Sequence, residues 1–136
     1  MTYVPTEADS PFHRLGGEVG VQAIAARFYD HMDADEPELA RLHALDANGK
    51  VSAGSRARFG LFLVEWTGGP PVYSPVHGHP RLRMRHGDVP VDGAMIAAWL
   101  RCMGKAMAEA GVDAEVHAFL MGRFGQICEN LRNIRG

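Results

Sequence analysis

The sequence predicts an all-α domain of four main helices with shorter helical turns between them. Apolar residues recur every three or four positions in several long stretches, as on one face of a helix. Only short segments alternate apolar and polar residues with the period of two expected of a strand. Glycine and proline clusters, Gly16-Gly17 and residues 68–71, separate the helical stretches. We find no internal repeat.

Length and composition fit one compact domain. The chain has 136 residues, and 46% of them are hydrophobic, which is enough to bury a substantial core. We expect a flexible N-terminal arm over residues 1–11 and the domain over residues 12–136. The 14 basic and 16 acidic residues are spread along the chain, with a net charge of −2, and this argues against nucleic-acid binding.

The chain also lacks the marks of an exported or membrane protein. Its first ten residues carry two acids and no apolar core, unlike a secretory signal. No apolar run approaches the roughly 20 residues of a membrane span. Cys102 and Cys128 lie in apolar-periodic segments, and we expect both to be buried, reduced thiols. We therefore expect a cytoplasmic protein with no membrane partner.

Two of the main helices are expected before residue 68. Residues 12–15 start a turn that the glycine pair breaks, and the first main helix begins at Val19 and stops near residues 33–37. Residues 38–43 are a candidate further turn, and residues 46–49 form an exposed one. The second main helix begins at residues 52–55 and ends at the Gly-Gly-Pro-Pro cluster. The apolar stripe along it is Ser55, Phe59, Phe62, Leu63 and Trp66, a wide flat wall.

The other two main helices follow residue 91. Asp92 is the expected N-cap of a helix that runs to about Ala110, and Gly111 ends it. Asp113 is the expected cap of the last helix, in which apolar residues recur to the end of the chain.

Residues 77–86 are the most unusual stretch, because they hold three histidines and three arginines. Pro80 is expected to open a short helix over residues 81–86 that ends near Gly87. One side of this helix would carry an apolar residue, a cation and an imidazole: Leu82, Arg85 and His86. An imidazole fixed in this way suits an iron ligand, and arginines beside it suit the carboxylates of a cofactor.

His77 and His79 allow a second interpretation, a zinc site shared with His86. A His-x-His pair with a distant third imidazole is a loose zinc signature, and the acid usually wanted nearby is missing. We favour a structural role in which both histidines hold the loop by hydrogen bonds.

Four segments resemble group II truncated haemoglobins: residues 28–29, 68–73, 78–86 and 98–103. The resemblance runs from about residue 12 to residue 133 and is loosest over residues 42–55. It implies a two-on-two helical sandwich around haem b. The family's proximal histidine, the iron ligand, falls on His86.

The resemblance also implies a distal side. The family's distal tyrosine and tryptophan fall on Tyr29 and Trp99, and His43 falls where the family places a ring over the haem. Ser55 and Phe59 match two further distal positions. The alternatives are internally satisfied aromatic residues and, for His43, a solvated loop imidazole. Phe59 departs from the family because its ring donates no hydrogen bond, and we expect it to narrow the ligand's path.

Three residues match positions that reach the haem propionates: Arg58, Tyr73 and Arg85. Each is equally compatible with a solvated side chain. Phe62 is expected to contact the cofactor from the apolar wall. After His86, Gly87-Asp88-Val89-Pro90 replaces an apolar-Pro-Phe run, so the proximal floor should be less bulky than usual.

The resemblance implies reversible binding of dioxygen and other diatomic ligands at ferrous iron. Hydrogen bonds from Trp99 and Tyr29 would favour dioxygen over neutral carbon monoxide. The alternative is a haem enzyme, peroxidase-like or nitric-oxide-dioxygenase-like, that works with a reductase partner. A helical interaction module without haem is the third hypothesis. The sequence is compatible with a monomer or a homodimer.

Overall fold

The predicted all-α class is confirmed. The structure, a computed structural model, describes residues 2–87 and 89–134, except for the side chains of Arg83 and Arg85. This part of the chain contains eight α-helices and no strand, with one isolated bridge between Leu45 and Val51. Within the same residues, no helix is long and apolar enough to cross a bilayer.

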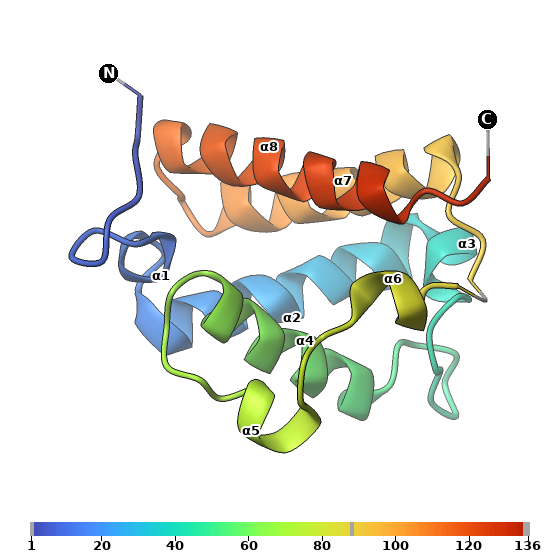
Figure 1. Ribbon diagram of the computed structural model, residues 1–136. Helices are drawn as coiled ribbons and strands as arrows, with labels where there is room; N and C mark the ends of the chain where they lie inside the picture. Colours follow the sequence, from blue (N-terminus) through green and yellow to red (C-terminus); the bar gives the residue numbers. More distant parts are fainter. Residues whose placement is uncertain (1, 88, 135–136) are drawn as a thin grey trace.

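Four long helices form two layers. They are α2 (Gly17–Asp35), α4 (Ala53–Trp66), α7 (Gly93–Glu109) and α8 (Ala114–Leu131). In Figure 1, α2 and α4 form the lower layer, and α7 and α8 form the upper one. α2 packs against both α4 and α7, and α7 packs against α8. The arrangement is the two-on-two sandwich that the resemblance to truncated haemoglobins implied.

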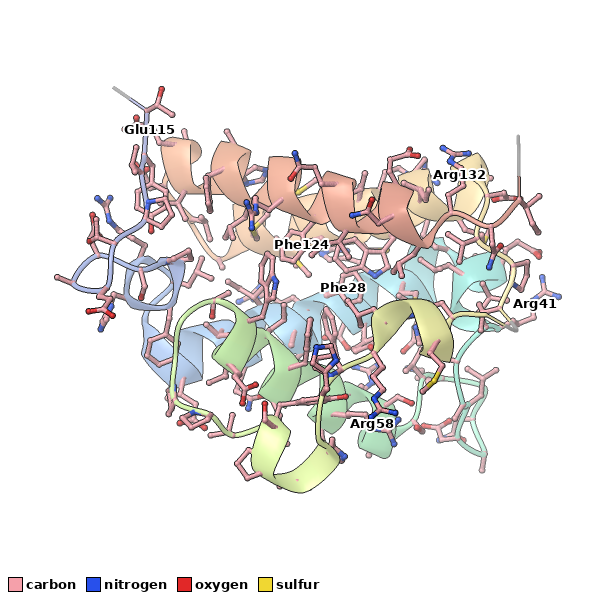
Figure 2. The ribbon with its side chains drawn as sticks, viewed as in Figure 1. Phe28, Arg41, Arg58, Glu115, Phe124 and Arg132 are labelled. Carbon is pink, nitrogen blue, oxygen red and sulfur yellow. The ribbon has the colours of Figure 1, made fainter. Side chains whose placement is uncertain are left out.

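The core lies between the layers. Among its largest fully buried side chains are Phe28 and Met32 of α2, Met103 of α7 and Leu120 of α8. Phe28 and Phe124, which belong to opposite layers, both point into the space between them (Figure 2). Burying one such side chain contributes about 1.5–3 kcal/mol, so this interface supplies much of the stability.

Side-chain caps fix where the long helices begin. Ser52 Oγ accepts a hydrogen bond from the Ser55 amide (3.2 Å), and the Asp92 carboxylate accepts one from the Met95 amide (2.9 Å). Asp113 accepts from two amides at the start of α8. Each cap satisfies an amide that has no partner within its helix. The predicted caps Asp92 and Asp113 are both confirmed.

Four short helices connect the long ones: α1 (Pro11–Arg14), α3 (Pro37–Ala40), α5 (Ser74–His77) and α6 (Leu82–Arg85). The sequence did not predict α5. Glu65 fixes its start by accepting hydrogen bonds from the Tyr73 and Ser74 amides (3.3 and 3.0 Å).

The prediction that Pro80 opens the histidine-bearing helix is wrong. Arg81 has φ 48°, in the left-handed region, so the helical conformation starts only at Leu82. The Arg81 amide donates to Nδ1 of His79 (3.0 Å), which helps to hold this turn. The helix ends at Arg85, and His86 follows as its C-cap.

Part of the predicted N-terminal arm packs onto the domain. Tyr3 is only 6% exposed, and its ring lies edge-on to Phe119 of α8, at 5.4 Å between centroids. Its hydroxyl donates to the carbonyl oxygen of Asp9 (2.8 Å). The flexibility of the arm and the boundary at residue 12 stay predictions.

Replacing Gly20 by alanine should lower the free energy of unfolding by about 1–3 kcal/mol. A Cβ atom at this position would lie 1.9 Å from the carbonyl oxygen of Leu15, which is backbone and cannot swing away. Gly122 in α8 is the matched control, because a Cβ there meets no atom within 4 Å. Gly122→Ala should raise stability by up to about 1 kcal/mol through helix propensity.

Urea unfolding of both variants, in the same ligand state, measures the difference. Equal stability of Gly20→Ala and the original chain would mean that α2 does not approach Leu15 this closely.

Candidate functional site

A cavity of about 350 Å³ lies between the layers, within the size range of small-ligand sites. Its walls come from α2, α4, α7 and α8 and from the segment around α6. Nine of the ten predicted site residues line it: Tyr29, His43, Ser55, Arg58, Phe59, Phe62, Tyr73, His86 and Trp99. The tenth, Arg85, has its side chain outside the described part of the chain.

His86 reaches this cavity from the end of α6. Its Nδ1 lies 2.7 Å from the carbonyl oxygen of Leu82, and its amide donates to the same oxygen at 3.0 Å. A carbonyl only accepts hydrogen bonds, so the contact assigns the ring proton to Nδ1. Nε2 then keeps its lone pair, which is the form that binds a metal.

His43 lies in the wall of the same cavity, and the residue is half-buried. Its Nδ1 donates to the carbonyl oxygen of Leu39 at 3.1 Å, and the ring lies edge-on to Tyr29 at 5.7 Å. Burial lowers the pKa of His43 below its usual value, and hydrogen bonds to the backbone only partly oppose this effect. The ring is therefore neutral near pH 7.

An aromatic cluster forms another part of the wall. The ring of Phe59 lies 5.5 Å from Tyr29 and 6.3 Å from Trp99, so it sits beside both predicted donors. Phe28 packs behind all three rings at 4.9–5.0 Å. The predicted narrowing by Phe59 is thus compatible with its position, although the path of a ligand stays a prediction.

Two polar atoms of this cluster have no partner. Tyr29 Oη and Trp99 Nε1 make no hydrogen bond to any residue that the structure describes. Over the same residues, no enclosed side-chain nitrogen or oxygen lacks a partner, so these two atoms must reach accessible space. Burial raises the pKa of Tyr29 far above its usual value. Both groups are therefore neutral donors open to the cavity.

Cationic and hydroxyl groups lie along α4 and before α5. Arg58 lines the cavity on the side of α4 that lies beneath α6 in Figure 2, and it pairs with no acid in the described chain. Tyr73 is 4% exposed and packs edge-on to Phe62 at 5.7 Å. Ser55 Oγ accepts from the Ser52 hydroxyl (3.2 Å). This edge suits an anionic group.

His77 and His79 do not line the cavity. The ring of His77 packs on Tyr73 at 5.0 Å, and His79 holds the turn at Arg81. No cluster of three metal-ligating side chains occurs among the residues described. The zinc interpretation finds no support here, whereas the structural role agrees with the contact of His79.

α8 provides a wall of the cavity that was not among the predicted site residues. Phe124, Ile127, Cys128 and Leu131 line the cavity at helical spacing, and this spacing was the available signal. Cys128 was predicted only to pack; it is a buried free thiol, and burial raises its pKa to about 11.

Asn133 was missed entirely. Its Nδ2 donates to the carbonyl oxygens of His86 and Val89 (3.1 and 2.8 Å), and its Oδ1 accepts from the Val91 amide (2.8 Å). No pattern in the sequence signals these long-range bonds.

The residues present fit a haem. The cavity is mostly apolar, as a flat hydrophobic macrocycle requires. One imidazole offers a free Nε2, two neutral donors are open to the same space, and Arg58 at the edge suits a propionate. After His86 the chain departs from the family's apolar-Pro-Phe run. In this segment Asp88 lies outside the described residues, while Val89 and Pro90 line the cavity.

The chain is similar to known globins over nearly its full length. The model of the bacterial-like globin family matches residues 10–133. The group 2 truncated haemoglobin YjbI of Bacillus subtilis is 32% identical over 92% of this chain and 89% of its own.

Solved structures agree. A cold-adapted truncated haemoglobin of Pseudoalteromonas haloplanktis TAC125 is 35% identical, with a TM-score of 0.83 over 92% of this chain and 98% of its own. A truncated oxygen-avid haemoglobin of Bacillus subtilis is 31% identical, with a TM-score of 0.79 over 91% of this chain and 99% of its own. The chain therefore belongs to the bacterial-like globins and, among them, to the group 2 truncated haemoglobins, so it is a haem-binding globin.

Proposed function

We propose that this globin holds haem b through Nε2 of His86 and reversibly binds dioxygen and other small diatomic ligands on the side of Tyr29 and Trp99. The observation that carries the proposal is the pair of unpartnered donors, Tyr29 Oη and Trp99 Nε1, in a mostly apolar cavity. When bound, haem would supply an iron that takes up diatomic gases and makes them partly negative. The relative from Bacillus subtilis that is described as oxygen-avid supports the choice of dioxygen.

The proximal role of His86 depends on two supports. The bond from Nδ1 to Leu82 fixes the tautomer and increases the basicity of Nε2. Asn133 ties the carbonyl of His86 to the end of α8, so the segment that carries the imidazole is attached to a long helix. We propose that both supports keep Nε2 directed into the cavity.

The distal donors act by hydrogen bonding to negative charge on the ligand. A hydrogen bond to a charged group contributes about 1.5–3 kcal/mol, which corresponds to roughly ten- to a hundredfold in the release rate. The same donors stabilise bound carbon monoxide less, because that ligand is neutral. The pocket should therefore retain dioxygen selectively. Arg58 and Tyr73 would bind the propionates at the edge of the cavity.

A haem enzyme with a reductase partner is the second candidate. The observation in its favour is the same donor pair, since these groups would also polarise hydrogen peroxide or nitric oxide in the pocket. Steady turnover of either substrate, compared with free haem, would distinguish an enzyme from a binding protein.

His86→Ala should remove the proximal ligand of ferrous haem, and the double variant His86→Ala/His43→Leu should show no histidine ligation at all, because His43 is the only other histidine in the described cavity wall. The ferrous absorption spectrum measures this. His117→Ala is the matched control, since His117 lies on α8 outside the cavity, and it should leave the spectrum unchanged. A histidine-ligated spectrum that survives in the double variant would reject the assignment.

Trp99→Phe should accelerate dioxygen release about tenfold or more, because it keeps the ring and removes the donor. Tyr29→Phe should act in the same direction, and the two effects should be non-additive if the groups share one ligand. Stopped-flow dissociation rates of dioxygen and carbon monoxide measure both variants and the double variant. A Trp99→Phe rate within about twofold of the original would show that the indole only packs.

Asn133→Ala should accelerate haem loss about fivefold, the equivalent of about 1 kcal/mol from lost hydrogen bonds. Asn130→Ala is the control, because Asn130 is exposed on α8 and makes no side-chain bond to any described residue. Transfer of haem to an excess of an apoglobin acceptor gives the rate. Equal rates in both variants would show that Asn133 does not support the proximal segment.

A further inference from the structure

Two imidazoles face the cavity, and the proposed function uses only one as an iron ligand. Among the described residues, His43 and His86 are the only histidines in the cavity wall. They come from different parts of the chain: His43 follows α3, and His86 follows α6. His43 lies against Tyr29, and no ring contact joins it to His86. The two rings thus belong to different walls of one space.

The two imidazoles are anchored in the same way. In each, Nδ1 lies at hydrogen-bond distance from the carbonyl oxygen four residues earlier: Leu39 for His43 (3.1 Å) and Leu82 for His86 (2.7 Å). Imidazoles that bind metals commonly donate their other nitrogen to a carbonyl in this manner. His43 therefore has the same free nitrogen, Nε2, as the proximal ligand.

Nε2 of His43 is also open. It bonds to no residue that the structure describes, and over those residues no enclosed polar side-chain atom lacks a partner. Nε2 therefore reaches accessible space on a residue that lines the cavity. A ligand group that lies in the cavity would satisfy this atom.

The position of His43 in the chain allows it to move. It lies between α3 and α4, on a connection with no helix from residue 41 to residue 52. Trp99, in contrast, is in the middle of the 17-residue helix α7. Among the polar groups of the distal wall, His43 is thus the one whose backbone can approach or leave a central metal without displacing a long helix.

We propose that Nε2 of His43 reversibly coordinates the haem iron opposite His86 when no external ligand is present. This inference rests on the proposed function, because it requires haem held by His86. An external ligand then competes with His43, and its apparent affinity falls by the fraction of iron that His43 leaves free. His43 would thereby set a threshold concentration of gas below which the site stays closed.

Absorption and electron paramagnetic resonance spectra of the purified haem-loaded protein test the proposal. The original chain should show low-spin iron with two imidazole ligands in both the ferric and the ferrous state. His43→Leu should give five-coordinate, high-spin ferrous iron. His43→Gln should do the same while keeping a polar side chain of similar length. The matched control is His117→Leu on α8, outside the cavity, which should remain low-spin.

Carbon monoxide binding by flash photolysis supplies a second readout. In the original chain the rate should level off at high carbon monoxide, because departure of His43 becomes limiting. In both His43 variants the rate should stay proportional to the gas concentration. If His43 coordinates nine-tenths of the iron in the original chain, the variants should bind carbon monoxide about tenfold more tightly.

The outcomes separate the inference from the function on which it rests. Five-coordinate ferrous iron in the original chain, with His86 as ligand, would overturn the role of His43 and leave the proposed function intact. Low-spin iron that persists in both His43 variants would overturn it as well, because another side chain, such as Tyr29 or Cys128, would then be the ligand. Failure of the original chain to bind haem would overturn the proposed function itself.

Discussion

The hydrogen bond from Nδ1 of His86 to the carbonyl of Leu82 is the interaction on which the site depends. It decides which ring nitrogen is free, and it fixes the ring relative to α6. The residues on either side of α6 position the helical turn that carries His86. Arg81 adopts a left-handed conformation just before it, and Asn133 fastens the backbone just after it. An imidazole on a free loop would lack this orientation.

The opposite wall is held by a different kind of constraint. Tyr29 is buried on α2, and the guanidinium of Arg56 lies 5.6 Å from its ring centroid. Arg56 also donates to the Val51 carbonyl (3.0 Å) and pairs with Asp33, which in turn accepts from the Val51 amide. This network attaches the end of the loop before α4 to α2. It leaves the earlier part of the loop, including His43, bound mainly by its own local hydrogen bonds.

Local chemistry explains what the sequence could predict. Helical periodicity identified the four long helices, and Asp92 and Asp113 were predictable because N-caps are short-range signals. The start of α6 was not predictable, since Pro80 is compatible with a first helical position and only the tertiary structure imposes the left-handed turn at Arg81. The bonds of Asn133 join residues more than 40 positions apart, which no local pattern encodes. For the same reason, the resemblance named the aromatic residues, but only the folded chain shows Phe59 beside both Tyr29 and Trp99.

The central claim is that one cavity presents the imidazole of His86 and the donors of Tyr29 and Trp99 to the same haem. A crystal structure of the haem-loaded protein with dioxygen tests it most directly. The account predicts Nε2 of His86 on the iron, and Tyr29 Oη or Trp99 Nε1 within hydrogen-bond distance of the ligand on the opposite face. Iron bound by His77 or His79, or a ligand pocket that neither donor reaches, would contradict it.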